Sequence, residues 1–306
     1  MLKRVAKEYP GTAESKEALG SIKSIYVEMN EVDEYVGFSK GIPQADISQS
    51  EQDSLTYIAA ENQYMNGNCA KATDGFAKYI NKFAEGSFIL EANFYKAECE
   101  YRSQRYEQAL GNYNFVLNQP RSRFTANAAA RVALIHHLQK NYEEAVESYI
   151  RLEETAEQPA MLQDAASGQM QCNYLLGRYG LAIQSAQKLL TFEKLSENLT
   201  TEAHFTIARS AYALTNTELS RKEFESTLKL SKNEMAAESK YMLAQIEFEN
   251  GKFAECEKTL FSLSENFASY DYWVAKGFLL LADVYVAQGN TFQARQTLQS
   301  IIDNYE

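Results

Sequence analysis

The side chains that could do chemistry are few and stand apart along the chain. The cysteines and histidines are Cys69, Cys99, Cys172, Cys256, His136, His137 and His204. No two cysteines form a CxxC pair, and no two histidines stand four residues apart on a shared helical face, so neither a zinc site nor a redox pair is predicted. Free cysteine usually behaves as a small apolar residue, and we expect all four to be buried in that role, without a disulfide.

Carboxylates are abundant, but nothing beside them suggests catalysis. Neighbouring acidic residues include Glu98, Glu100, Glu143, Glu144, Glu153 and Glu154. Two carboxylates on one helix are common by chance, so they do not predict an acid pair of the glycosidase kind. The chain has no glycine-rich phosphate loop, no G-x-S-x-G motif and no histidine placed beside a plausible nucleophile. We therefore predict a protein that is not an enzyme and needs no metal, nucleotide or other cofactor.

The helices that must position these residues are recognised from a sequence pattern that repeats at a regular spacing. Short turn motifs recur every 36 to 38 residues, and each is followed three residues later by a small side chain. The turn positions are Cys69, Tyr106, Tyr142, Tyr179, Thr217, Phe253 and Thr291, and the small positions are Ala72, Ala109, Ala145, Ala182, Ser220, Cys256 and Ala294. Nine residues before each turn stand Ala60, Ala97, Ala133, Met170, Ala208, Ala244 and Ala282. Columns that hold one register over so long a stretch indicate a helical repeat array.

Packing explains the order of small and large residues in each repeat. Two helices that cross closely need small side chains at the crossing, so Ala97 and Ala109 are predicted to be in contact, with Tyr113 filling the space beside them. Each helical pair has one face without an internal partner. Stacking the next pair buries that face, so the array is stable only as a series.

These columns resemble the tetratricopeptide repeat (TPR) family, whose unit is a helix, a tight turn and a second helix. The resemblance implies an all-α fold, a right-handed superhelical solenoid of about eight TPR-like units across residues 1–306. The predicted units are 12–41, 51–84, 87–119, 124–156, 160–194, 199–231, 234–267 and 271–306. First helices are predicted near 12–28, 51–66, 87–103, 124–139, 160–176, 199–214, 234–250 and 271–288. The segment from Gly41 to Ser50, which includes Pro43, breaks the rhythm as a long loop or a hinge.

Binding sites in this family lie mainly on the concave face, which the first helices line. Aromatic residues seven apart lie on one helical face, with a polar position between them. The partner-binding residues predicted on this basis are Tyr57, Glu61, Tyr64, Phe94, Glu98, Tyr101, Gln171, Tyr174, Phe205, Arg209, Tyr212, Tyr241, Gln245 and Phe248. The rings have two open interpretations: they line a groove, or they pack between neighbouring units. The polar positions are the better candidates for direct contact with a ligand.

The charge of the chain limits its partners. Lys and Arg number 30 and Asp and Glu number 41, which gives a formal net charge of −11. Nucleic-acid affinity depends on neutralising phosphates with basic residues, so DNA and RNA are not expected ligands. No run of about 18 apolar residues is present, so no segment is predicted to span a membrane. The expected partner is a protein or a peptide.

We therefore predict a protein-interaction scaffold that binds its partner along the concave face. The long repeat units also resemble TPR proteins of the bacterial cell envelope, which implies a periplasmic or outer-membrane-associated parent. Unpaired cysteines instead favour a reducing compartment such as the cytoplasm, and both locations stay open. Two other functions remain as alternatives: a glycan-binding surface protein, and a docking region of an enzyme. Because both ends of the sequence read as helices without a polar cap, we expect a fragment of a longer protein.

Overall fold

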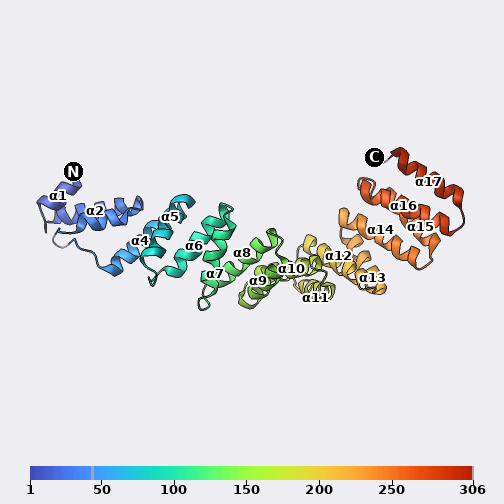
Figure 1. Ribbon diagram of the computed structural model, residues 1–306, viewed down its shortest axis with the longest axis horizontal. Coiled ribbons are helices and arrows are strands. Elements are labelled where there is room, and N and C mark those ends of the chain that lie inside the picture. The colour runs from blue at the N-terminus through green and yellow to red at the C-terminus, as the bar shows by residue number, and fades with distance from the viewer. Residues whose placement is uncertain (43–44, 305–306) are drawn as a thin grey trace. The chain divides into compact units, whose positions relative to one another are not determined.

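The computed structural model describes residues 1–42 and 45–304, and over these ranges the chain forms 17 α-helices and no strand (Figure 1). A short helix, α1 (Leu2–Glu8), precedes eight pairs. The pairs are α2 (Ala13–Glu28) with α3 (Val32–Ser39), α4 (Gln49–Met65) with α5 (Cys69–Lys82), α6 (Ile89–Arg102) with α7 (Tyr106–Leu117), α8 (Thr125–Leu138) with α9 (Tyr142–Thr155), α10 (Pro159–Leu175) with α11 (Tyr179–Leu189), α12 (Glu197–Ala213) with α13 (Thr217–Leu230), α14 (Glu234–Glu249) with α15 (Phe253–Asn266), and α16 (Asp271–Ala287) with α17 (Thr291–Asn304). The chain is an all-α helical repeat solenoid.

The turns inside the helical pairs share one backbone conformation. Two residues before each second helix, the chain adopts a left-handed conformation with φ between 58° and 77°. These residues are Asn30, Gly67, Gln104, Lys140, Gly177, Thr215, Gly251 and Gly289. Glycine adopts this conformation without steric cost, whereas a β-branched residue such as Thr215 is strained there.

The crossing of the two helices in each pair matches the prediction from the small residues. Ala97, Ala109 and Tyr113 are all fully buried. In a later pair, the Ser220 hydroxyl donates a hydrogen bond to the Ala208 carbonyl at 3.0 Å, which joins the two small positions directly. Small side chains therefore set the close approach of the helices.

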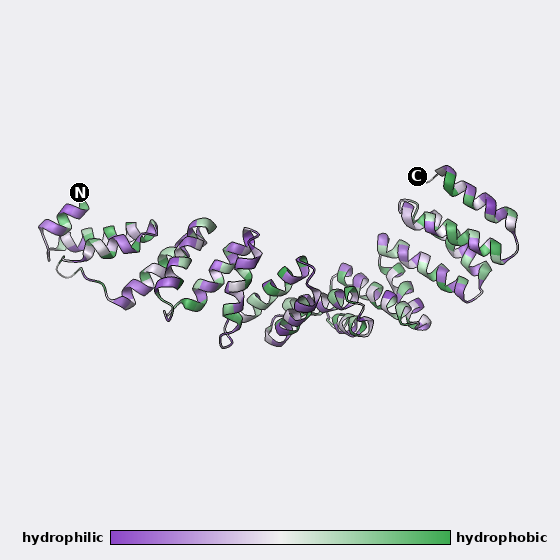
Figure 2. Ribbon diagram, viewed as in Figure 1, coloured by the Kyte–Doolittle hydropathy of each residue, from purple (hydrophilic) through white to green (hydrophobic). Residues whose placement is uncertain are grey.

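The chain divides into two compact units, residues 1–135 and 136–306. In the first, one core cluster surrounds Phe76 and Tyr79 and another surrounds Ile22 and Tyr35. In the second, separate clusters follow one another along the helical pairs. Hydrophobic and hydrophilic residues are mixed along the helices of both units (Figure 2). The predicted organisation as a single solenoid domain with the unit bounds given above stays a prediction.

The break in the rhythm is a loop where it is described. Ile42 and Ala45 are buried, and α4 begins at Gln49 after Ser48 has capped its N-terminus. Pro43 lies outside the described residues. Within residues 1–42 and 45–304, no helix has the length and apolar content needed to cross a membrane.

Candidate interaction surface

First helices contact one another along each unit, and the predicted binding residues lie on them. Contacts join α4 to α6 in the first unit, and α10 to α12, α12 to α14 and α14 to α16 in the second. The first ring of each predicted pair is core in α4, α6 and α12. Tyr57 is 4% exposed and stacks on Phe88 at 4.4 Å, and Phe94 lies 4.6 Å from Phe124. Phe205 is buried as well.

In the first unit, the polar position between the rings serves the fold. Glu98 is 6% exposed, accepts a hydrogen bond from the Tyr113 hydroxyl at 2.6 Å and pairs with Arg131 at 2.9 Å. Burial raises the pKa of Tyr113, and the adjacent Glu98 carboxylate raises it further. Tyr57 donates to Glu61 at 2.7 Å. Glu98 therefore does not face an open groove.

The second ring of each predicted pair in the first unit, Tyr64 or Tyr101, is half-buried and lies against an arginine. Arg102 donates to the Tyr64 hydroxyl at 3.1 Å, and the guanidinium of Arg131 lies 4.7 Å from the centre of the Tyr101 ring. Such cation–π contacts contribute about 0.5–2 kcal/mol, depending on how far the cation is desolvated. These two rings are held by their own unit.

In the second unit, the corresponding residues form a chain of contacts nearer the surface. Tyr212 donates to Glu249 at 2.6 Å, and Gln245 donates to the same carboxylate oxygen at 2.9 Å. The Tyr241 hydroxyl lies 3.3 Å from Gln245, and the ring of Phe248 is 5.7 Å from that of Phe253. Glu249 is exposed, and the other five side chains are half-buried.

A pocket of about 320 Å³ opens on the first helices of the second unit. Its lining comes from α10, α12 and the start of α14, together with one residue of α8, and consists of His137, Gln171, Tyr174, Leu175, Glu202, Phe205, Thr206, Arg209 and Met235. Gln171, Tyr174, Phe205 and Arg209 were predicted from the sequence as binding residues, and here they share one pocket. Their binding role stays a prediction.

The arginine of this pocket is held in place by its neighbours. The Arg209 guanidinium lies 4.9 Å from the centre of the Tyr174 ring and 5.4 Å from that of Phe205. Its Nε atom pairs with Glu238 at 3.2 Å. Across the pocket, Gln171 donates to Glu202 at 2.7 Å. The rings are therefore fixed by cation–π contacts before any ligand arrives.

Leu175, Glu202, Thr206 and Met235 also line the pocket, and the sequence reasoning did not select them. Leu175 lies one residue after Tyr174 at the end of its helix, and Met235 belongs to the first turn of the next pair's first helix. The repeat register could locate each residue on its own helix. It could not tell which residues of successive pairs face one another.

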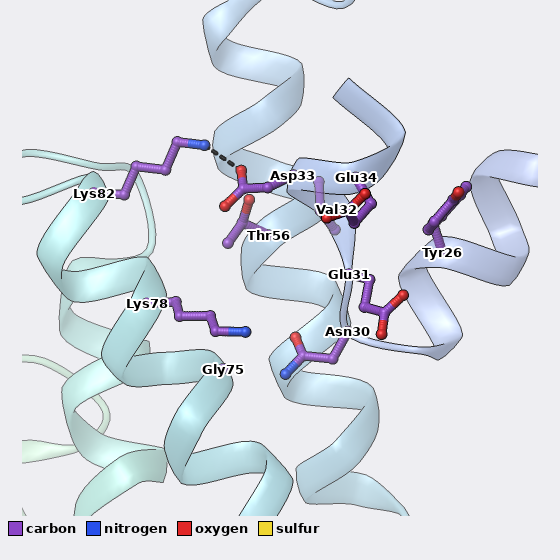
Figure 3. Close-up of a pocket in the computed structure, with 10 residues that line it drawn as sticks. All are labelled: Tyr26, Asn30, Glu31, Val32, Asp33, Glu34, Thr56, Gly75, Lys78 and Lys82. Atoms are coloured by element: carbon purple, nitrogen blue, oxygen red, sulfur yellow. Dashed lines mark hydrogen bonds and ion pairs between the residues drawn. The ribbon is translucent and has the colours of Figure 1, made fainter. Parts of the chain in front are cut away.

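A second hollow, in the first unit, lies away from the predicted residues. About 400 Å³ in volume, it is bordered by the α2–α3 turn, α4 and α5. Figure 3 shows Lys82 paired with Asp33 at one side, with Lys78 and Asn30 pointing into the space below. Acidic and basic side chains both line it, so it has no clear preference for the charge of a ligand.

The expectation that all four cysteines are free is wrong. Cys69 and Cys99 form a disulfide, with Cα atoms 5.0 Å apart, whereas Cys172 and Cys256 are free and buried. Cys69 begins the second helix of one pair and Cys99 lies in the first helix of the next. The sequence reasoning compared cysteines in the same column and so missed two different columns that meet at every junction between pairs.

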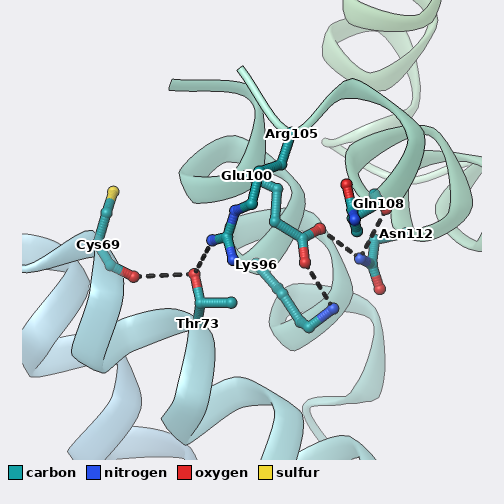
Figure 4. A network of polar contacts seen from close by, with 7 residues as sticks. All are labelled: Cys69, Thr73, Lys96, Glu100, Arg105, Gln108 and Asn112. Carbon is teal, nitrogen blue, oxygen red and sulfur yellow. Dashed lines mark hydrogen bonds and ion pairs between the residues drawn. The ribbon is translucent and has the colours of Figure 1, made fainter. Parts of the chain in front are cut away.

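Polar contacts reinforce this junction (Figure 4). Arg105 donates to the Thr73 hydroxyl at 3.3 Å, which ties α5 to the start of α7. The nearby Glu100 is buried, and it accepts from Lys96 at 2.8 Å and from Asn112 at 2.6 Å. Both carboxylate oxygens of Glu100 are thus engaged in structural hydrogen bonds.

One histidine of the second unit lies beside a thiol. His137 Nδ1 is 3.5 Å from Cys172 Sγ. Burial raises the pKa of the Cys172 thiol to about 11, so it stays protonated at neutral pH, and the thiolate is the reactive form of cysteine. The pair is therefore a poor nucleophile. Across residues 1–42 and 45–304, no three His, Cys, Asp or Glu side chains cluster as metal ligands.

Family models for the tetratricopeptide repeat match residues 205–260 and 277–306. Both segments carry tetratricopeptide repeats. Repeats of this family form protein-interaction scaffolds, and the chain belongs to that general class. No curated protein sequence matches it.

Two solved structures share the fold at low sequence identity. The C-terminal part of a TPR repeat-containing protein from Cytophaga hutchinsonii has a TM-score of 0.58 and 14% identity, over 82% of this chain and 96% of its own. A signal-transduction ATPase with a tetratricopeptide repeat sensor, from Pyrococcus horikoshii, has a TM-score of 0.53 and 12% identity, over 96% of this chain and 46% of its own. At such identities the likeness concerns the fold alone.

Proposed function

We propose that this TPR protein is a non-catalytic scaffold that binds a partner protein or peptide on the first-helix face of residues 136–306. The observation that carries the proposal is the pocket between α10, α12 and α14. It brings together residues from successive pairs, and four of them are the Gln171, Tyr174, Phe205 and Arg209 that the repeat register predicts as partner-binding residues.

The chemistry of the pocket suits a polypeptide side chain. Phe205, Leu175 and Met235 supply apolar walls, while Gln171 and Glu202 place polar groups at the edge. A volume of about 320 Å³ is at the lower end for ligand pockets, so one large side chain fits better than an extended ligand. A buried anchor residue surrounded by a polar rim is the usual pattern of a protein-interaction hot spot.

We further propose that the scaffold works outside the cytoplasm, in a complex of the bacterial envelope. Disulfides persist in oxidising compartments such as the periplasm and are rare in the cytosol. The Cys69–Cys99 disulfide therefore supports the location that the resemblance to envelope TPR proteins implies.

Peptide selection from a random library tests the binding proposal. We expect the purified chain to enrich a set of peptides. These peptides should bind the Leu175→Glu variant at least about tenfold less tightly than the wild type, because the variant places a charge in the apolar wall of the pocket. Leu214→Glu is the matched control, because Leu214 is 50% exposed, close to the 52% of Leu175, and does not line the pocket. Failure to enrich any peptide, or equal binding by all three proteins, would contradict the proposal.

A further inference from the structure

The two units differ in charge. Residues 1–135 hold 17 acidic and 15 basic residues, whereas residues 136–306 hold 24 acidic and 15 basic, so formal charges of −2 and −9 make up the total of −11. The excess falls partly on the first helices of the second unit. Helices α10, α12, α14 and α16 carry nine acidic and three basic residues.

Two of the three basic residues on these helices, Arg209 and Lys276, already have partners. Arg209 pairs with Glu238 and covers Tyr174. The ammonium of Lys276 lies 5.0–5.4 Å from the ring centres of Tyr241, Tyr272 and Trp273. The third, Lys240, is half-buried with its charge near Glu247. A partner with acidic side chains would find few free cations here.

One carboxylate at the rim of the pocket is free to accept more bonds. Glu202 is half-buried, and its Oε1 accepts from Gln171 at 2.7 Å. Its Oε2 accepts no hydrogen bond from the residues that the structure describes. A carboxylate can accept several hydrogen bonds, and those from a cationic donor are the strongest. The free oxygen stands beside the apolar walls that Leu175 and Met235 provide.

We infer that the pocket takes a large apolar side chain from a basic segment of a partner protein, with a lysine or arginine next to that side chain reaching Glu202. The inference rests on the proposed function and specifies the partner's chemistry. Apolar burial in the pocket supplies the anchor. The excess of carboxylates on the surrounding first helices attracts the flanking positive charges and repels an acidic segment.

Three synthetic nine-residue peptides test this inference by fluorescence anisotropy. The first has one tryptophan between two pairs of lysines, the second replaces the lysines by glutamates, and the third replaces the tryptophan by alanine. At about 50 mM salt we expect the first to bind at least about tenfold more tightly than either of the others. Its affinity should fall at about 0.5 M salt, where screening shortens the reach of the charges to a few ångströms.

A matched pair of variants locates the effect. Glu202→Gln should weaken binding of the lysine–tryptophan peptide by about threefold, the usual size of one partly exposed ion pair. Glu225→Gln removes the same charge from the exposed surface of the second helix α13 and should leave binding unchanged.

The other outcomes separate the inference from the proposed function. Equal or tighter binding of the glutamate peptide would overturn the basic partner, while binding that depends on Leu175 would leave the scaffold proposal standing. If the protein binds library-selected peptides but does not bind the lysine–tryptophan peptide, the inference alone is overturned. If neither the three peptides nor the random library yields a binder, both fail, and affinity for an oligosaccharide instead would assign the surface to glycans.

Discussion

The two units use one repeat plan but hold their pairs together by different chemistry. Residues 1–135 contain the disulfide between α5 and α6 and the buried ion pairs of Glu98 and Glu100. The described residues 136–304 contain no disulfide, and their first-helix face carries half-buried rings, a pocket and an acidic excess. The first unit buries Glu98 and Glu100 near its disulfide, whereas the second keeps Gln171, Glu202 and Arg209 half-buried at its pocket.

The corresponding junction in the second unit shows how the difference arises. Tyr142 stands at the start of α9, as Cys69 stands at the start of α5, and Cys172 lies 30 residues after it, as Cys99 does after Cys69. With tyrosine in place of the first cysteine, Cys172 stays a thiol next to His137, and the ring of Tyr142 packs on His137 at 5.8 Å. The register is shared, but the contact changes from a covalent bond to packing.

Reduction of the disulfide should give the largest difference between the units. A cross-link between residues 30 apart stabilises a fold by about 3–4 kcal/mol through loss of chain entropy in the unfolded state. We expect dithiothreitol to speed amide hydrogen exchange in α4–α7 and to leave residues 136–304 unchanged, since Cys172 and Cys256 are already thiols. Unchanged exchange in α5 and α6 would show that packing alone holds this junction.

Gly168→Ala tests the packing that replaces the cross-link in the second unit. A Cβ added at Gly168, in α10, would collide with the ring of Tyr149 from α9. Overpacking of this kind costs about 1–3 kcal/mol, which should appear as a lower denaturation midpoint. Gly180→Ala is the control, because nothing lies within 4 Å of its added Cβ, and it should raise stability by about 0.5–1 kcal/mol. Equal midpoints for the two variants would contradict close packing at this junction.

Thr215→Gly tests the strain in the turns, which both units contain. Thr215 has φ of 58°, and a left-handed conformation costs a residue with a branched Cβ about 1–2 kcal/mol. Part of the gain is lost to the greater freedom of glycine in the unfolded chain, so we expect a net stabilisation of about 1 kcal/mol by urea denaturation. Asn30→Gly in the first unit should gain less, because asparagine tolerates this conformation. A loss of stability at Thr215 would mean that its side chain contributes more than its strain costs.

Glu238→Gln should produce the smallest effect, visible as a change in pH dependence. Burial raises the pKa of Glu238 above its ordinary value of 4.5, while Arg209 and Lys276 oppose the shift and Glu234 adds to it. Because the folded chain holds this proton more tightly, the contribution to stability is present below pH 4.5 and is lost as the pH rises through the raised pKa.

The wild type should therefore lose stability relative to Glu238→Gln between about pH 4 and neutral pH. Thermal midpoints measured across this range give the difference directly. Glu225→Gln, at an exposed position, should run parallel to the wild type. If the Glu238→Gln and wild-type curves are also parallel, the carboxylate does not experience the burial that the structure gives it.

Much of the fold could be predicted because a repeat is a local pattern. The predicted first helices begin and end within two residues of those observed, and the small columns that mark the crossings are buried, as Ala133 and Ala145 illustrate. These features depend on side chains within about 38 residues of one another. The sequence alone therefore determined the all-α repeat architecture, the positions of the turns and the crossing points.

The tertiary structure decided which residues at a given repeat position are exposed enough to contact a partner. Tyr57 and Leu279 occupy the same register position, yet Tyr57 is 4% exposed and Leu279 is 48% exposed. The same geometry joins Cys69 to Cys99, buries Glu98 under Arg131 and brings Met235 to the pocket of Phe205. Each of these contacts depends on how far one helical pair is rotated and shifted against the next, and a periodic sequence repeats the residues of a pair without specifying that offset.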